Sequence, residues 1–185
     1  MKNTYLTSYF PLLSILLFSL SLSIRIEMVL IDFLRKTGIY DGMREFFSDG
    51  GIKLALLALL CVLLFMVFAA LKLIADTINQ LALLFFSKDS EGDSLKQIRT
   101  GSTIYFIGGV LSLLGMYSFI GIGIVFLSTT LIYFIYFVYK ISPALTTLGT
   151  IGMIFFQVVV WSSLLTGIFY LGIKVYNSIM ASLPI

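Results

Sequence analysis

The feature that most constrains this chain is an uninterrupted apolar run in its first half. Residues 54–71 contain no polar side chain except the thiol of Cys61. A helix of about 20 apolar residues is long enough to cross the hydrocarbon core of a bilayer. Because backbone groups in lipid must form their hydrogen bonds internally, such a run is expected to be a helix and not an open strand. This run therefore predicts a membrane-spanning helix.

The composition of the whole chain agrees with this prediction. Hydrophobic residues make up 59% of the sequence and charged residues only 11%, whereas a soluble domain carries about 25% charged residues. So few charges leave too little polar surface to coat a water-soluble globule. A length of 185 residues fits one domain. We therefore expect residues 1–185 to form a single integral membrane domain of the all-α class, a polytopic transmembrane helical bundle.

The remaining apolar runs bring the prediction to about five spanning helices. Residues 101–139 carry no charge, and as one helix they would be roughly 58 Å long, nearly double a hydrocarbon core of about 30 Å. Two spans joined by a tight turn near residues 117–123 fit this length better, with four spans in total or a re-entrant hairpin as the alternatives. The expected spans are residues 6–24, 53–75, 103–118, 122–140 and 148–173.

The connections between these spans include two polar segments. Residues 25–50 interleave acidic and basic side chains with apolar ones, a pattern typical of amphipathic helices that lie along the membrane surface. Residues 87–101 are the most hydrophilic stretch and predict an exposed loop. The helical pattern also continues after the second span, so we expect that helix to leave the core near Ala75 and to continue as an amphipathic extension towards Phe86.

Several function classes are excluded by the residues that the chain lacks. It contains no histidine, which removes the commonest general base and the commonest metal ligand. Its single cysteine cannot form an intrachain disulfide, and no dense basic run suggests a nucleic-acid partner. We therefore expect no enzyme activity, no cofactor and no metal site, and a lipid-modifying enzyme is the weakest of the alternatives. Six basic residues fall on each predicted side of the membrane, so its orientation stays open.

One polar stripe stands out at the end of the second span. Lys72, Asp76 and Asn79 fall at helical spacing on one face. Ionisable residues at membrane depth are costly and often mark a path for ions or protons, so Asp76 is a candidate for binding a cation or proton, with Lys72 as its resting partner. The alternative is that the two residues simply end the apolar run, where Lys72 snorkels to the interface and Asp76 meets headgroup water.

The later spans carry groups that are suited to contacts between helices. Gln157 lies within the last span, and amide side chains there commonly hydrogen-bond to a neighbouring helix. We expect Gln157 either in such packing or in contact with an ion, substrate or partner. The pairs Gly108/Ser112 and Ser163/Gly167 are small-xxx-small patterns, which let helices approach closely.

Three segments of the chain resemble a known family. They are MKNTYLTSYFPLLSI, DGMREFFSDGGIKLALL and ALKLIADTINQLALLFFSKD, and they are similar to the YufK-like family of small membrane proteins from Bacillus-type bacteria. The resemblance implies a multi-pass protein of the bacterial cytoplasmic membrane. It assigns no catalytic or binding residue, so it adds no mechanism.

The function that fits these observations best is a non-enzymatic one. We expect an accessory or scaffold subunit of a membrane assembly, in contact with the lipid bilayer and with another membrane protein or further copies of the same chain. The packing glycines and the surface-lying segment at residues 25–50 favour this role. The alternative is a small oligomeric ion or solute transporter that uses the Lys72/Asp76 stripe.

Overall fold

The structure is a computed structural model, and it describes residues 8–88, 92 and 98–182. In these ranges the chain forms helices and turns but no strand, which confirms the predicted all-α class. The helices are α2 (Phe10–Lys36), α3 (Ile39–Arg44), α4 (Asp49–Phe86), α6 (Ser102–Leu114), α7 (Phe119–Ile141) and α8 (Thr147–Ser182), with short 3-10 helices at Arg99–Gly101 and Ser142–Ala144.

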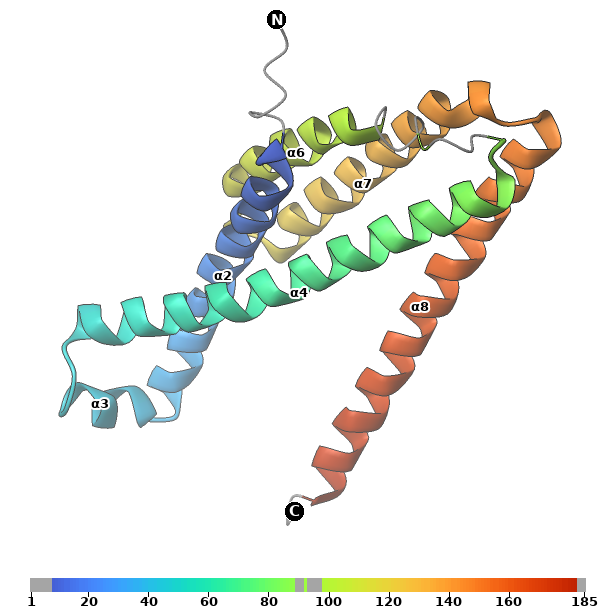
Figure 1. The fold of residues 1–185 in the computed structure, drawn as a ribbon. Coiled ribbons are helices and arrows are strands. Elements are labelled where there is room, and N and C mark those ends of the chain that lie inside the picture. The colour runs from blue at the N-terminus through green and yellow to red at the C-terminus, as the bar shows by residue number, and fades with distance from the viewer. Residues whose placement is uncertain (1–7, 89–91, 93–97, 183–185) are drawn as a thin grey trace, which may run out of the picture.

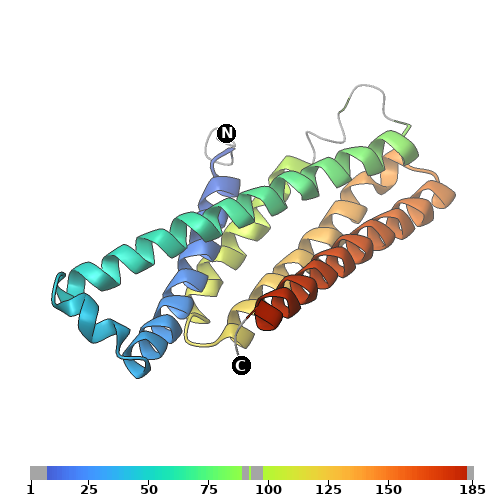
Figure 2. The same ribbon diagram turned by 90° about the horizontal axis from the view of Figure 1, so that it is seen from below.

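The long helices pack together in one group, and the last helix diverges from this group. α2 packs against both α4 and α6, and α6 packs against α7. The start of α8 packs against the end of α4, after which α8 runs away from the other helices (Figure 1). Seen from below, α2 and α6 lie between α4 on one side and α7 and α8 on the other (Figure 2).

Four helices of the described chain are long and apolar enough to cross a membrane: α2, α4, α7 with the short helix after it, and α8. The prediction was about five, and the helix that falls short is α6. Its 13 residues make it about 20 Å long, against a hydrocarbon core of about 30 Å. α6 ends early because the turn occupies residues 115–118, ahead of the predicted position. The Ser118 hydroxyl accepts a hydrogen bond from the Gly121 amide and so caps the start of α7.

The first spanning helix is longer than the sequence predicted. α2 passes its expected end at residue 24 and continues without a break to Lys36. The break comes only at Gly38, whose φ of 73° lies in the left-handed region that favours glycine. The predicted interfacial segment, residues 25–50, therefore consists of the end of α2, the short helix α3 and the turn into α4.

α2, α3 and α4 meet in a tightly connected corner. Ile31, Tyr40 and Ile52 are buried together there, one from each helix. The Tyr40 hydroxyl donates a hydrogen bond to one carboxylate oxygen of Asp49 at 2.6 Å, and the Lys53 ammonium lies 2.7 Å from the other oxygen. This corner fixes where α4 begins. From there α4 runs as one helix to Phe86, which confirms the predicted extension beyond the apolar run.

Small residues bring α2, α6 and α7 close together. Gly108 and Ser112 are both buried in α6, as their small-xxx-small spacing predicted. The hydroxyl oxygens of Ser21 in α2 and Ser112 lie 2.7 Å apart in a buried hydrogen bond. A Cβ atom at Gly108 would lie 2.2 Å from the Thr129 hydroxyl of α7, so only glycine fits there.

Three phenylalanines mark the level at which α2, α4 and α7 meet. The ring of Phe18 lies 6.0 Å from that of Phe68 and 5.4 Å from that of Phe126, between centroids. The rings of Phe68 and Phe126 are 5.6 Å apart. Aromatic rings attract one another at such distances, so this triad joins α4 to the α2–α6–α7 group at one defined height.

We predict that Gly108→Ala destabilises the protein. The new methyl group would force α6 and α7 apart, and overpacking of this kind costs about 1–3 kcal/mol. Gly123→Ala in α7 is the matched control, because a Cβ atom there meets nothing within 4 Å and alanine favours a helix over glycine by about 0.5–1 kcal/mol. Thermal unfolding in detergent should give a lower Tm for the first variant only. Equal Tm values for the two variants would contradict the close α6–α7 contact.

Candidate functional site

The predicted polar stripe lies on one face of α4, together with Phe68. Lys72 and Asp76 are four residues apart, and the Lys72 ammonium donates to a carboxylate oxygen of Asp76. Asn79 follows one turn later on the same face. Because Phe68 contacts Phe126, this face of α4 is the one that looks towards α7.

Asn79 connects this stripe to two further helices. Its side-chain oxygen accepts a hydrogen bond of 2.8 Å from the Gln157 amide of α8. Its side-chain nitrogen donates to the Tyr133 hydroxyl of α7 at 3.5 Å. Gln157 is only 3% exposed, so the amide pair is an internal contact between helices. The structure therefore brings Asn79 and Gln157 together, although they are separated by 78 residues in the sequence.

Two tyrosines complete the polar network, and the sequence did not single them out. The rings of Tyr105 in α6 and Tyr133 lie 5.1 Å apart, and the Tyr105 hydroxyl donates to Thr130 at 3.4 Å. In the sequence, Tyr133 opens an aromatic-rich stretch that is typical of a membrane interface. This pattern therefore gave no sign that Tyr133 lies between helices.

The contacts of α4 with α7 fix the level of the Lys72–Asp76 pair. Phe68 lies beside Phe126, and Asn79 lies beside Tyr133. Since the pair stands between these two points on α4, it lies level with the part of α7 between Phe126 and Tyr133. That part is the middle of α7, a helix of 23 residues and about 35 Å. The pair is thus beside the centre of a candidate span and not beside its end.

The ion pair is not fully enclosed by its own chain. The Lys72 and Asp76 side chains are 33% and 44% exposed, respectively. A charged pair at membrane depth is costly unless protein or water surrounds it. In chemical terms, the arrangement offers one carboxylate that can hold a proton or a cation and one ammonium that neutralises it, with a hydrogen-bonded group of amides and a phenol one turn further along α4. In the described part of the chain, no three His, Cys, Asp or Glu side chains come together as a metal site.

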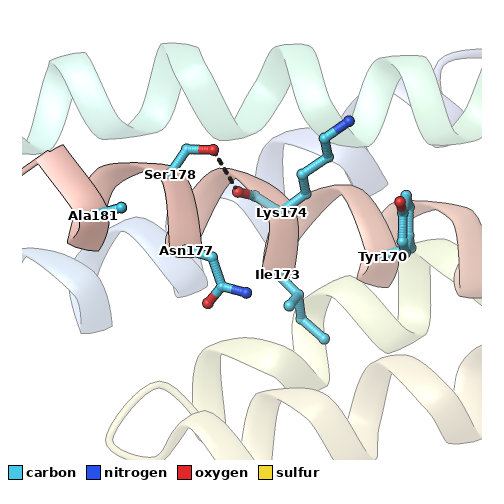
Figure 3. Close-up of a pocket in the computed structure, with 6 residues that line it drawn as sticks. All are labelled: Tyr170, Ile173, Lys174, Asn177, Ser178 and Ala181. Atoms are coloured by element: carbon cyan, nitrogen blue, oxygen red, sulfur yellow. Dashed lines mark hydrogen bonds between the residues drawn. The ribbon is translucent and has the colours of Figure 1, made fainter.

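A shallow depression elsewhere on the surface does not form a comparable site. It is lined by Tyr170, Ile173, Lys174, Asn177, Ser178 and Ala181. All six belong to α8, and the hydrogen bond drawn there joins the Ser178 hydroxyl to the Lys174 carbonyl of the same helix (Figure 3). Because no second helix closes over it, this depression is the open side of one helix and not an enclosed pocket.

We predict that the Asn79–Gln157 contact couples α4 to α8 energetically. Gln157→Ala and Asn79→Ala should each destabilise the protein, and the double variant should lose less than the sum, because both single variants remove the same hydrogen bond. Hydrogen bonds between membrane helices are worth about 0.6–2 kcal/mol, which is the expected coupling energy. Reversible unfolding in detergent measures it, with Thr37→Ala in place of Gln157→Ala as the control pair, because Thr37 is exposed after the end of α2 and bonds only to its own helix. Strictly additive losses for Asn79 and Gln157 would show that the contact contributes nothing.

Comparisons with known proteins agree with the predicted resemblance. A family described as "Family of unknown function (DUF5366)" matches residues 27–184. The chain is also 50% identical to a Bacillus subtilis (strain 168) protein described as "Uncharacterized membrane protein YufK", over the full length of both chains. No solved structure matches the chain. The resemblance to the YufK-like family is thereby confirmed, and the chain is an integral membrane protein that belongs to this family.

Proposed function

We propose that this chain is a non-enzymatic accessory or scaffold subunit of a larger assembly in the bacterial cytoplasmic membrane. The observation that carries the proposal is the second half of α8, residues 158–182, which we call the α8 arm. Among its described side chains none is buried, and the arm stands apart from the other helices (Figure 1). The base of the same helix, in contrast, is held by buried Met153 and Gln157.

The residues of the α8 arm are suited to contact with another helix. Ser162 and Thr166 share one face, and Ser163 and Gly167 lie one turn apart on a neighbouring face. A Cβ atom at Gly167 would meet nothing within 4 Å, so the chain itself does not use this close-packing position. Small residues and hydroxyls are the groups through which membrane helices associate. Their exposure on an arm that has no buried side chain among those described supports a role in assembly.

Photo-crosslinking in native membranes tests this role. A photoreactive amino acid at Ser162 should capture a protein partner, because this position faces outward on the α8 arm. The same amino acid at Met153, which is fully buried, should give only crosslinks within the chain. Mass spectrometry then identifies what was captured. Recovery of the chain only as a monomer from both positions would count against an accessory role.

A second candidate function is the movement of ions or small solutes, and the Lys72–Asp76 pair supports it. The pair lies level with the middle of α7, beside amide and phenol groups from three helices. In this role Asp76 holds the transported cation or proton, and Lys72 neutralises the carboxylate when the site is empty. Transporters often show two matching halves. This chain has no clear repeat of that kind, so we rank transport second.

Flux into reconstituted vesicles tests this second function. Asp76→Asn keeps the shape of the side chain but removes its charge, and it should abolish any flux of cations or protons. Asp41→Asn is the matched control, because Asp41 is an exposed carboxylate on α3 outside the network, and it should leave the flux unchanged. An Asp76→Asn protein that transports as well as the parent would remove Asp76 from the pathway.

A further inference from the structure

We propose that the chain forms a two-fold dimer in which the α8 arm of each copy covers the Lys72–Asp76 pair of the other. The inference rests on the proposed assembly role and names the partner as a second copy of this chain. Three observations carry it: an ion pair that its own chain leaves partly open, an arm with no buried side chain among those described, and positions of the two at similar distances from the Asn79–Gln157 contact along their helices.

The open ion pair provides the reason for an additional contact. Lys72 and Asp76 neutralise each other, but about a third or more of each side chain is not covered. Their position beside the middle of α7 places this open surface far from both ends of a candidate span. Acyl chains cannot hydrogen-bond to the remaining carboxylate and ammonium groups. A surface that carries hydroxyl groups can satisfy them.

The α8 arm carries hydroxyl groups at the same level. α8 starts beside the end of α4 and then runs back while it diverges from α4, so positions further along α8 correspond in depth to earlier positions on α4 (Figure 1). Gln157 is level with Asn79, to which it bonds. Ser163 follows Gln157 by about 9 Å along the helix, and Lys72 precedes Asn79 by about 10 Å. Ser163 therefore stands at nearly the height of Lys72.

Because Ser163 and Lys72 lie at similar depth within one chain, two-fold symmetry also places Ser163 of one copy at the depth of Lys72 in the other. A two-fold axis along the membrane normal leaves the depth of every residue unchanged, so the arm of one copy meets the ion pair of the other at the right height. Both arms and both ion pairs are then used, and the contact closes as a dimer without leaving a free surface of the same kind. Within one chain the arm points away from α4 and cannot make this contact (Figure 1).

Disulfide trapping tests the dimer, and the single cysteine of the chain makes it simple. Cys61→Ser gives a parent without cysteine. One copy then carries Ala75→Cys, which lies on the polar face of α4 between Lys72 and Asn79, and a second copy with a different affinity tag carries Ser163→Cys. When both are produced in one membrane and oxidised mildly, a disulfide can form between the two introduced cysteines only across two chains. We expect a band that carries both tags.

The matched control is Leu165→Cys in place of Ser163→Cys. Leu165 is exposed like Ser163, at 63%, but it points to nearly the opposite side of the helix from Ser163. We expect several-fold less of the two-tag band with it. Equal amounts from both cysteines would indicate random collision and overturn the dimer. The uncrosslinked parent in nanodiscs should also have the mass of two chains, a readout that does not depend on the new cysteines.

Two further results separate this inference from the proposed function. If the Ser163 cysteine gives no two-tag band and the parent has the mass of one chain, while the photoreactive group at Ser162 captures a different protein, the dimer is wrong and the accessory role stands. If neither experiment finds any protein on the arm, both the dimer and the accessory role are wrong.

Discussion

The close approach of α2, α6 and α7 is the contact on which the rest of the structure depends. Membrane helices gain little from the hydrophobic effect when they meet, because lipid tails are as apolar as the side chains. Their association relies on dispersion contacts and hydrogen bonds, and both need backbones that lie near each other. Gly108 against Thr129, and the buried bond between Ser21 and Ser112, provide this nearness. With these three helices fixed, Phe68 sets the height at which α4 crosses them.

The second half of α4 then determines where α8 begins. The ring of Phe86 fills the space that a side chain at Gly152 would need, since a Cβ atom there would lie 2.6 Å from it. Two turns earlier, Asn79 bonds to the buried Gln157. α8 is thus held near its start at two separate levels and has no comparable contact along the described part of its second half. Because α8 is fixed near its start, the α8 arm projects in a defined direction, in which a partner can bind it.

The local features of this fold could be read from the sequence, whereas those that depend on neighbouring helices could not. The all-α class and the continuation of α4 to Phe86 follow from helical periodicity, which is a property of one segment. The position of the turn before α7 depends on the Ser118 cap and was predicted slightly too late. The level of Asp76 depends on which part of α7 lies beside it, and no local pattern records that. Tyr133 was overlooked because aromatic residues near a span end have an ordinary explanation.

The start of α6 lies at one end of the polar network, and the two ends of the network differ in chemistry. A Cβ atom at Gly101 would touch the rings of Tyr133 and Tyr136, so Gly101 lies level with the network although α7 continues for two more turns to Ile141. Arg99, which lies two residues before Gly101, is exposed on this side. Towards the other side, the Phe18, Phe68 and Phe126 rings form an apolar barrier. The polar network therefore has tyrosine rings and an exposed arginine towards one end, and a cluster of phenylalanine rings towards the other.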